Sequence, residues 1–554
     1  MQKPWLARYP TGVSQEIDSN RFSSIVDLFE ESVGKYRERD AFVNMGAAMT
    51  FEDLNYMSAD FASFLQNTAG LKKGDRIAIQ MPNLLQYPVA LFGALRAGLI
   101  VVNTNPLYTA REMKHQFKDS GAKAIVIFAG AAHLLEEILP ETDIETVVVT
   151  NVGDLMGFPK SLLVNSVVKY VKKMVPAYHL PDAYSFYEAL DLGRDASFRP
   201  VKSAPEDIAF LQYTGGTTGV SKGAMLTHKN VLSNMLQITE WMKPQLVPGE
   251  EIVILALPLY HIFSLTVNGL GILYYGGTNL MITNPRDIPG FIKTLRTHKF
   301  TVFTGLNTLY NALMNHPDFD KIDFSNLKVG VAGGMALQRA VAEKWMKLTK
   351  SVLVEGYGLT ETSPVASCNP IDGTDKVGTI GLPLPSTEMK LCADDGKDVA
   401  PPGPGEICIK GPQVMKGYWH RDDETAKMML PGGWIRTGDI GEMDPEGFFK
   451  IVDRKKDMII VSGFNVYPNE VEEVVALHPK VLEVAAVGVQ DAHSTEAVKV
   501  FIVKRDPSLT EAEVFEHCKT HLTAYKRPKH VEFRKELPKT PVGKILRREL
   551  RDTK

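Results

Sequence analysis

The sequence predicts an α/β fold: a large N-terminal domain of helix-covered, mainly parallel sheets plus a β-rich subdomain, with a small α+β C-terminal domain. Three observations support this prediction. The first 450 residues alternate short apolar runs with helical patterns, which is typical of parallel sheets covered by helices. The region 380–450 differs because it is rich in Gly and Pro. The charged cluster 453–457 is followed by a segment with strand and helix patterns of its own.

The alternation is clearest between residues 77 and 128, where a β-α-β-α-β order is expected. The strands are expected at 77–81, 99–102 and 124–128, and the helices at Gln86–Arg96 and from Thr109 to about Ser120. Gly98 is expected to end the first helix, and Thr109 and Glu112 have the spacing of a capping box that starts the second. Sheets of this kind bind ligands at the carboxyl ends of their strands.

The later elements are expected to form two smaller units. They are strands at 405–411, 483–489 and 498–504 and a helix at 510–523. We expect the N-terminal domain to cover residues 1–453, a hinge to cover 454–456, and the C-terminal domain to cover 457–554. The alternative is that the charged cluster is only a solvated turn, as most charge runs are.

Composition excludes several classes of protein. The 554 residues are 44% hydrophobic and 23% charged, which is ordinary globular usage and excludes a disordered or fibrous chain. The formal net charge of −3 excludes bulk attraction to nucleic acid as the main activity. The four cysteines include no CxxC pair, so we expect buried thiols in a reducing compartment. Without a signal-peptide core or an 18-residue apolar run, we expect a cytoplasmic protein, at most peripheral on the inner face of the membrane.

The most informative stretch is YTGGTTGVSKGA, residues 213–224, which follows an apolar run at 208–212. Its glycines let backbone N–H groups converge on an anion, its threonine hydroxyls add donors, and Lys222 adds a positive charge. This combination predicts a triphosphate-binding loop. It is not a Walker A loop, because Lys222 lies between Ser221 and Gly223 rather than between Gly and Ser or Thr. A flexible Gly/Thr turn is the alternative.

Further motifs follow this loop in a fixed order. They are LPLYHIF at 257–263, EGYGLTE at 355–361, TGD at 437–439, DRKKDMIIVSGFNVYPNEVE at 453–472 and PKTPVGKILRREL at 538–550. Together the motifs resemble the adenylate-forming superfamily of acyl-CoA synthetases, luciferases and peptide-synthetase adenylation domains, over about residues 50 to 550. Residues 432–456 resemble the signature of fatty-acyl-CoA synthetases, and within these the resemblance is to the bacterial long-chain fatty-acid–CoA ligases.

The resemblance implies an ATP-dependent ligase of fatty-acid metabolism that works in two half-reactions. A fatty carboxylate attacks the α-phosphate of ATP to give acyl-AMP and pyrophosphate, and the thiolate of coenzyme A then displaces AMP. The resemblance also implies Mg²⁺ as cofactor, a C-terminal domain that moves between the half-reactions, and a homodimer as one option. Two other functions stay open: an enzyme that loads acyl groups onto a carrier protein, and a non-catalytic nucleotide- or lipid-binding protein.

The resemblance also implies the residues that bind ATP. They are Tyr213, Thr214, Gly215, Gly216, Thr217, Thr218, Gly219 and Lys222 in the loop, Gly356, Tyr357 and Gly358 at the adenine, and Asp439 and Arg454 at the ribose. Tyr357 offers a flat face to adenine, and Asp439 suits a bidentate contact with two ribose hydroxyls. Without the motifs around them, Tyr357 would be read as core packing and Asp439 as a turn residue.

The implied catalytic residues are His261, Thr360, Glu361 and Lys544. Glu361 is expected to hold Mg²⁺, because a carboxylate beside a triphosphate is unfavourable without a divalent ion. His261 would orient the acyl carboxylate, and Lys544 would stabilise the transition state of the first step. Without the motifs, Glu361 would be read as a helix-start carboxylate, His261 as a core histidine and Lys544 as a surface lysine.

Three residues of the 453–472 motif concern the hinge, the coenzyme A passage and the class of acid. Lys456 matches the hinge position, and Gly463 matches the glycine whose bare backbone lets the pantetheine arm of coenzyme A pass. Ile460 departs from the pattern of some aryl-CoA ligases, which carry there a lysine that contacts the adenylate. This departure argues against an aryl-acid ligase.

Residues 160–178 contain lysines and no acidic residue. Their apolar positions at helical spacing are Val164, Val167, Val168, Val171 and Val175, and their polar positions are Asn165, Lys169, Lys172 and Lys173. A helix of this kind suits the surface of an anionic membrane. The equally weighted alternative is a surface helix that packs its valines on the core.

Overall fold

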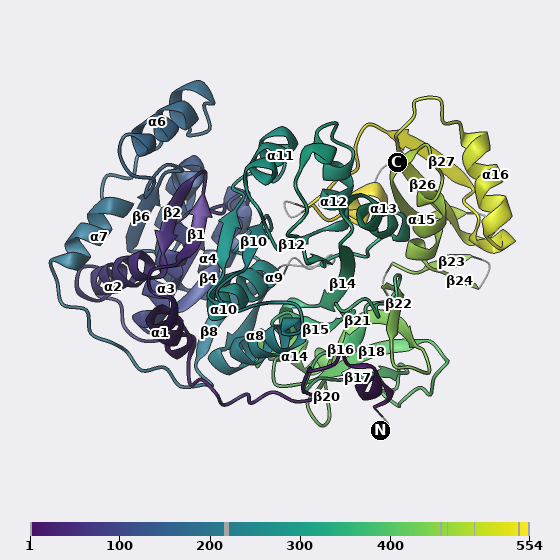
Figure 1. Cartoon of the computed structure of the whole chain (residues 1–554), viewed down its shortest axis with the longest axis horizontal. Helices are drawn as coiled ribbons and strands as arrows, with labels where there is room; N and C mark the ends of the chain where they lie inside the picture. The colour runs from purple at the N-terminus through teal and green to yellow at the C-terminus, as the bar shows by residue number, and fades with distance from the viewer. Residues whose placement is uncertain are drawn as a thin grey trace.

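The computed structural model describes residues 3–214, 221–454, 457–461, 464–491, 494–540 and 543–551 (Figure 1). Their strands form two large sheets, of nine and eight strands, and two five-stranded sheets. In Figure 1 the eight-stranded sheet lies at the left, the nine-stranded sheet extends through the middle, and the last five-stranded sheet lies at the right. The predicted α/β class is therefore confirmed.

The eight-stranded sheet carries the predicted phosphate loop. Its strands, in spatial order, are β19 (Gly417–Tyr418), β9 (Lys222–Thr227), β8 (Ile208–Thr214), β4 (Ile100–Asn103), β3 (Arg76–Gln80), β5 (Ala122–Phe128), β6 (Thr146–Thr150) and β7 (Tyr184–Ser185). From β8 to β7 every neighbouring pair is parallel, whereas β9 runs antiparallel to both β8 and β19. The predicted strands lie within one or two residues of β3, β4 and β5.

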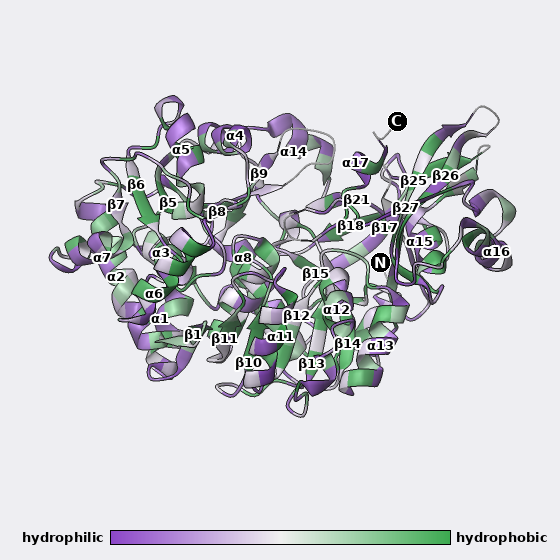
Figure 2. Ribbon diagram, turned by 90° about the horizontal axis from the view of Figure 1, so that it is seen from above, coloured by the Kyte–Doolittle hydropathy of each residue, from purple (hydrophilic) through white to green (hydrophobic). Residues whose placement is uncertain are grey.

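The nine-stranded sheet is parallel in its centre and antiparallel at both edges. Its strands, in spatial order, are β16 (Leu382–Pro383), β15 (Val365–Cys368), β14 (Val352–Gly358), β13 (Val329–Ala332), β12 (Val302–Gly305), β10 (Ile252–Leu255), β11 (Thr278–Met281), β1 (Asp40–Asn44) and β2 (Ala47–Thr50). The antiparallel pairs are β1 with β2, β14 with β15 and β15 with β16. Figure 2 shows both large sheets as hydrophobic strands surrounded by helices of mixed character.

Helices cover these sheets and fill the space between them. The helices up to residue 349 are α1 (Ile25–Tyr36), α2 (Phe51–Asn67), α3 (Gln86–Arg96), α4 (Ala110–Ser120), α5 (Ala132–Ile138), α6 (Lys160–Ser166), α7 (Phe186–Arg194), α8 (His228–Met242), α9 (Ile262–Ser264), α10 (Leu273–Tyr275), α11 (Ile288–Thr297), α12 (Asn307–Met314) and α13 (Arg339–Thr349). The bounds of α3 match the prediction. The predicted capping box at α4 is present, because Thr109 accepts from the Glu112 backbone and Glu112 accepts from that of Thr109.

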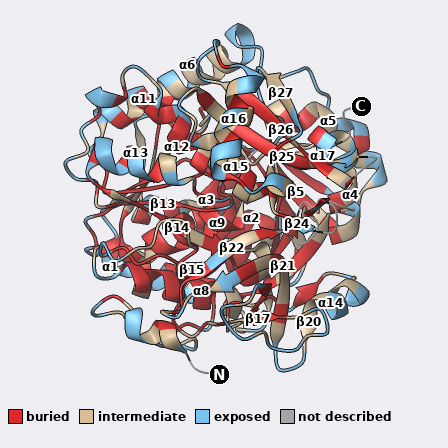
Figure 3. Cartoon of the chain, turned by 90° about the vertical axis from the view of Figure 1, so that its right-hand side faces the viewer, coloured by how far each residue is buried: buried red, intermediate tan, exposed pale blue. Residues whose placement is uncertain are grey.

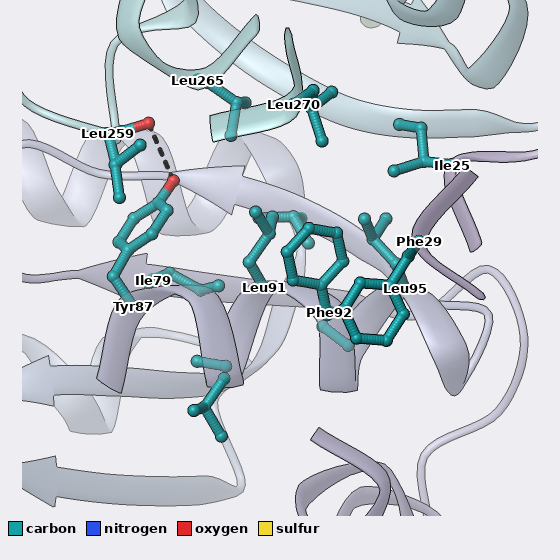
Figure 4. Packing of buried hydrophobic residues seen from close by; sticks show 14 of the residues in the cluster. Ile25, Phe29, Ile79, Tyr87, Leu91, Phe92, Leu95, Leu259, Leu265 and Leu270 are labelled. Atoms are coloured by element: carbon teal, nitrogen blue, oxygen red, sulfur yellow. Dashed lines mark hydrogen bonds between the residues drawn. The ribbon is translucent and has the colours of Figure 1, made fainter. Parts of the chain in front are cut away.

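Helix α3 is buried along its whole length. One core cluster contains α3 together with Ile79 and Val101 of the eight-stranded sheet and Phe42 and Leu255 of the nine-stranded sheet. Figure 4 shows part of this packing, in which the rings of Phe29 and Phe92 are stacked with their centroids 4.3 Å apart. A helix that is apolar all round is expected to be buried, and α3 lies between strands β3 and β4 on one side and helices α1 and α2 on the other.

The two five-stranded sheets follow in sequence. The β-rich subdomain contains β17 (Glu388–Cys392), β18 (Gly405–Lys410), β21 (Trp434–Met443), β20 (Met429–Leu430) and β22 (Phe449–Arg454), all antiparallel, with helix α14 (Asp422–Met428) beside them. The C-terminal sheet contains β24 (Phe464–Val466), β23 (Ile459–Val461), β26 (Thr495–Lys504), β25 (Val481–Asp491) and β27 (His530–Arg534), with helices α15 (Pro468–Ala476), α16 (Glu511–His521) and α17 (Arg547–Arg551).

The charged cluster 453–457 joins these two sheets. Asp453 is fully buried, and its carboxylate accepts a hydrogen bond of 2.9 Å from the backbone N–H of Asn469. Arg547 approaches Asp453 at 4.0 Å and Asp457 at 3.6 Å. The alternative of a solvated turn is therefore wrong for Asp453. Lys455 and Lys456 lie outside the described residues.

The segment 158–178 differs from the predicted helix. Helix α6 gives way to a π-helical turn, Val167–Val171, and helical structure ends near Lys173, whose φ is +52°. Val164 and Val168 pack against the core, as the structural alternative expected. A second apolar set is exposed: Phe158, Leu162, Leu163, Tyr170, Val171 and Met174. We call this set, with the exposed Lys169, Lys172 and Lys173, the 158–174 surface.

Two composition-based expectations can be compared with the structure. All four cysteines are buried and unpaired, which confirms the expectation of buried thiols. Among the described residues, no helix is long and apolar enough to cross a bilayer. Figure 3 shows that buried residues are concentrated in the sheets and that the exposed ones lie mainly on peripheral helices and loops.

Candidate active site

The ends of β8 and β9 frame the predicted phosphate loop. The two strands pair as far as Thr214 and Lys222, which are directly opposite each other. Residues 215–220 lie outside the described part of the chain, so Gly215, Gly216, Thr217, Thr218 and Gly219 stay predictions. The same holds for Lys456, Gly463 and the side chain of Arg454. The described residues nevertheless fix where the loop leaves and re-enters the sheet.

Lys222 has two close neighbours from the segment 417–428. Its ammonium forms a hydrogen-bonded ion pair with Glu424 and lies 5.0 Å from the centre of the Tyr418 ring. The Tyr418 hydroxyl donates a hydrogen bond to the Glu361 carboxylate. One tyrosine therefore connects the lysine expected at the phosphates with the carboxylate expected to hold the metal.

Tyr213, at the start of the predicted loop, has its side chain bonded within the protein. Its hydroxyl donates to Asp119 at 2.7 Å, and its ring lies against Gly223, where an added Cβ would come within 3.1 Å. Burial, together with this carboxylate, raises the pKa of Tyr213 well above its usual value. Asp119 also pairs with Arg421 at 3.1 Å. The Tyr213 side chain therefore stabilises the strand, and its hydroxyl is bonded within the protein rather than directed at a ligand.

Strand β14 carries the predicted adenine motif. Tyr357 is buried and donates a hydrogen bond of 2.7 Å from its hydroxyl to the carboxylate of Asp439. Asp439, on β21, is itself 2% exposed and is paired in register with Arg454 of β22. Gly358 is needed sterically, because a Cβ there would lie 1.9 Å from the Pro364 carbonyl oxygen. The structure therefore brings the predicted adenine and ribose residues together.

Glu361 and Thr360 lie in the 3₁₀ turn Thr360–Thr362 that follows β14. The Glu361 carbonyl accepts from the Met415 backbone at 2.9 Å, which fixes the turn against the β-rich subdomain. The carboxylate faces a neutral hydroxyl donor, Tyr418. Mg²⁺ that arrives with a nucleotide is usually held by one or two carboxylates and the phosphates. Glu361 therefore fits the implied Mg²⁺ as a single protein ligand.

His261, near the middle of the chain, lies within electrostatic range of Lys544, which is near the C-terminus. His261 caps α9, where its Nδ1 accepts from the Phe263 backbone N–H at 3.3 Å. Burial, aided by the nearby Lys544 ammonium, lowers the pKa of His261 to about 4. The ring is therefore neutral at physiological pH, and because Nδ1 is an acceptor, the proton is on Nε2. His261 is a hydrogen-bond donor at that nitrogen.

The loop that carries Lys544 is docked on the N-terminal domain. The Thr308 hydroxyl donates to the Gly543 carbonyl at 3.3 Å, and the Asn311 amide donates to the Leu482 carbonyl at 3.0 Å. At Gly543, φ is +88°, a left-handed conformation that favours glycine. This turn places Lys544 close enough to His261 to lower the pKa of the imidazole.

Two residues of the site were not singled out in the sequence. Tyr418 and Glu424 lie in a Gly- and Pro-rich region whose sequence carries no catalytic pattern. Their role depends on β19 pairing with β9, which joins residues about 190 positions apart, as in the pairs Gly417 with Met225 and Tyr418 with Ala224. The one sequence signal that could have pointed to this stretch is the aromatic pair Tyr418-Trp419 beside Gly417.

Comparisons with known proteins agree with this geometry. The family model for the AMP-binding enzyme matches residues 29–419, and that for the AMP-binding enzyme C-terminal domain matches residues 470–544. The chain is 58% identical over 552 residues to a long-chain-fatty-acid–CoA ligase of Escherichia coli O157:H7, covering 100% of this chain and 98% of the relative. It is 39% identical over 555 residues to the Bacillus subtilis ligase of the same name, covering 99% and 98%.

Solved structures share the fold. The anthranilate CoA ligase AuaEII in complex with anthranoyl-AMP has a TM-score of 0.85 at 25% identity, covering 96% of this chain and 98% of that one. ATP-bound MatB from Rhodopseudomonas palustris has a TM-score of 0.82 at 27% identity, covering 95% and 98%.

The fold, the order of the predicted motifs and the matched family models together define the class: an adenylate-forming enzyme. The chain belongs to the AMP-binding enzyme family. Within that family it is related over its full length to the bacterial long-chain-fatty-acid–CoA ligases.

Proposed function

We propose that the protein activates long-chain fatty acids to acyl-CoA through an acyl-AMP intermediate. In the first step a carboxylate oxygen bonds to the α-phosphorus of ATP, and the bond to pyrophosphate breaks. In the second step the coenzyme A sulfur bonds to the acyl carbon, and AMP leaves with the electron pair of the mixed anhydride. The identity of 58% along the whole chain to a long-chain-fatty-acid–CoA ligase supports this activity.

The observation that carries the proposal is the meeting of His261 with Lys544. The first step brings two anions together, and a cation at their junction lowers the repulsion in the transition state. Lys544 supplies that cation, while the Nε2–H of the neutral His261 donates to an oxygen of the acyl carboxylate and fixes its direction. We expect both residues to act on the same junction, because the Gly543 turn docks on Thr308 and the positive charge of Lys544 is near enough to lower the pKa of the imidazole.

The remaining site residues bind the nucleotide. Asp439 would accept from the ribose hydroxyls, Tyr357 would lie against adenine, and Lys222 would neutralise the β- and γ-phosphates with the loop that precedes it. Glu361 is the residue that would hold Mg²⁺, with Thr360 beside it. When bound, Mg²⁺ supplies charge neutralisation for the triphosphate.

The proposal is tested by separating the half-reactions. ATP–pyrophosphate exchange should depend on palmitate and proceed without coenzyme A. Replacing Lys544 with Ala should lower this exchange about 10²–10³-fold, while the variant still converts supplied acyl-AMP and coenzyme A to the thioester. Lys539→Ala is the matched control, because Lys539 lies on the same loop but pairs with Glu483 at 2.6 Å.

Three outcomes would contradict the proposal. Equal loss of both half-reactions in Lys544→Ala would remove the assignment of this lysine to the first step. Adenylation without any transfer to coenzyme A would instead favour the loading of a carrier protein. Nucleotide or lipid binding without exchange would favour a non-catalytic protein.

We also propose that the 158–174 surface docks on the inner face of an anionic bilayer, so that a cytoplasmic enzyme takes its substrate from the membrane. Phe158 is 89% exposed and Val171 74%, although burial of such side chains is favourable by about 1.5–3 kcal/mol each. Three exposed lysines flank them, and each adds about 1 kcal/mol of attraction to an anionic surface. Apolar and basic groups on one surface match the chemistry of anionic lipid.

Vesicle co-sedimentation tests this second proposal. Replacing Lys169, Lys172 and Lys173 with Gln, or Phe158 and Leu162 with Ser, should reduce binding to phosphatidylglycerol vesicles without lowering activity on dispersed short-chain acids. Leu107→Ser is the control, because Leu107 is 59% exposed outside this surface. Unchanged sedimentation of both variants would contradict the docking.

A further inference from the structure

Helix α14 follows directly after β19 and places a carboxylate on the lysine expected at the phosphates. Glu424 accepts from Lys222 and, through its other oxygen, from Lys427 at 2.6 Å. Lys222, and to a lesser degree Lys427, lowers the pKa of Glu424 to about 2. Both side chains of the Lys222–Glu424 pair are 28% exposed, so water and soluble anions can reach it.

The backbone around Glu424 fixes it relative to Lys222. Tyr418 donates its backbone N–H to the Thr425 hydroxyl at 2.9 Å, and that hydroxyl donates to the Arg421 carbonyl at 2.9 Å. These bonds tie the first turn of α14 to β19, which in turn pairs with β9, the strand that begins at Lys222. The contact between Glu424 and Lys222 is therefore a product of the fold rather than of two flexible side chains alone.

We infer that Glu424 is a positioning residue that holds Lys222 in the nucleotide-free enzyme and competes with the triphosphate for it. The inference rests on the proposed assignment of Lys222 to the phosphates. A lysine ammonium has three donor hydrogens on one compact charge, and the phosphate oxygens and Glu424 attract that same charge. ATP binding must therefore weaken the ion pair, and pyrophosphate release restores it.

This competition has two consequences for the reaction. It lowers the affinity for ATP, because part of the binding energy is used to separate Lys222 from Glu424. It also speeds product release, because Glu424 replaces pyrophosphate at the ammonium. Lys427 modulates both effects, since it shares the Glu424 carboxylate and so weakens the hold of that carboxylate on Lys222.

The test is a pair of substitutions with opposite expected effects on Mg·ATP binding, measured by titration calorimetry without fatty acid. Glu424→Gln should lower the Kd about two- to fivefold, the range of an exposed ion pair, and should strengthen inhibition by pyrophosphate to a similar degree. Lys427→Gln should raise the Kd, because Glu424 then pairs with Lys222 alone. In the Glu424→Gln background, Lys427→Gln should have no such effect. Asp422→Asn is the matched control, because Asp422 is an exposed carboxylate on the same helix turn.

Three results would contradict the inference or the phosphate assignment on which it rests. Unchanged Kd values and unchanged pyrophosphate inhibition in Glu424→Gln would overturn the inference, even if the melting temperature falls, because a merely structural ion pair affects only stability. An equal rise in Kd for Lys427→Gln in both backgrounds would mean general attraction by Lys427 and would also overturn it. Lys222→Ala separates the two proposals: if it leaves ATP binding unchanged, the phosphate assignment itself is wrong.

Discussion

The charged residues that would meet ATP already have partners inside the protein. Asp439 accepts from Tyr357, Glu361 accepts from Tyr418, and Lys222 pairs with Glu424. A buried polar group without a partner is costly, so these contacts stabilise the site when no nucleotide is bound. A nucleotide that binds here therefore replaces hydrogen bonds within the protein, because these donors and acceptors already have partners.

Glu355, at the start of the adenine motif, gives a pH-dependent prediction at the residue scale. Burial, aided by the charge of Glu473, raises the pKa of Glu355 to about 8. The folded protein therefore binds a proton there that the unfolded chain releases near its ordinary pKa of 4.5. The resulting stability is complete below pH 4.5 and is lost as the pH rises to about 8.

We expect the free energy of unfolding of the wild type to fall, relative to that of Glu355→Gln, between pH 5 and pH 8. Gln is nearly isosteric and does not titrate, so only the proton-linked component disappears. Urea denaturation at several pH values measures both curves. A difference that stays constant over this range would contradict a raised pKa.

The site residues were predictable from the sequence to the extent that they lie in contiguous motifs. Lys222, Glu361 and Asp439 each belong to a short run in which spacing and residue type favour one chemistry. Tyr418 and Glu424 were not predictable, because their contacts depend on the pairing of β19 with β9. Tyr213 was predicted from its place in the loop motif, whereas its hydroxyl is bonded to Asp119.

At the scale of the element, helix α3 shows how completely a helix can be enclosed. Its apolar residues pack against α1, α2, β3 and β4, so truncation at any of them leaves a cavity. Leu91 is 2% exposed, and Leu107, in a loop, is 59% exposed. The substitution Leu→Ala at these two positions therefore separates the effect of burial on stability from the effect of residue type.

We expect Leu91→Ala to lower the free energy of unfolding by about 2–5 kcal/mol and Leu107→Ala to change it by less than about 0.5 kcal/mol. The reason is the lost packing plus the residual cavity at Leu91. Chemical denaturation followed by circular dichroism measures both. Similar values for the two variants would contradict the enclosure of α3.

Element predictions succeeded where local signals were strong. The bounds of α3 and the N-cap of α4 were predicted correctly because apolar runs and capping pairs act over a few residues. The segment 160–178 was predicted less well. Its π-helical turn shifts the spacing, so Val171 is exposed while Val164 and Val168 pack on the core. An analysis of sequence periodicity assumes a constant number of residues per helical turn, so it does not reveal such a shift.

At the scale of the whole molecule, side-chain hydrogen bonds help to hold the C-terminal domain against the N-terminal domain. The Asn311 amide bonds to the Leu482 carbonyl, and Thr308 bonds to the Gly543 carbonyl. If this position is the one that forms acyl-AMP, weakening it should affect that half-reaction alone.

We expect Asn311→Ala to slow acyl-AMP formation roughly two- to tenfold, the range of a single hydrogen bond, and to leave thioester formation from supplied acyl-AMP unchanged. Single-turnover assays of each half-reaction measure this split. Asn326→Ala is the control, because Asn326 is an exposed residue of the N-terminal domain. Slowing of both half-reactions to the same degree would contradict the assignment of this position to the first step.

The enclosure of α3 also constrains how the protein is made. Tyr87 of α3 donates to the Leu259 carbonyl at 3.0 Å, and Leu265 and Leu270 belong to the same core cluster (Figure 4). Leu259 leaves the ribosome 172 residues after Tyr87. Until this segment is synthesised, the side of the apolar helix that it covers is exposed in the nascent chain. Chaperones that recognise apolar segments are expected to bind during this interval, and truncations before Leu259 are expected to aggregate.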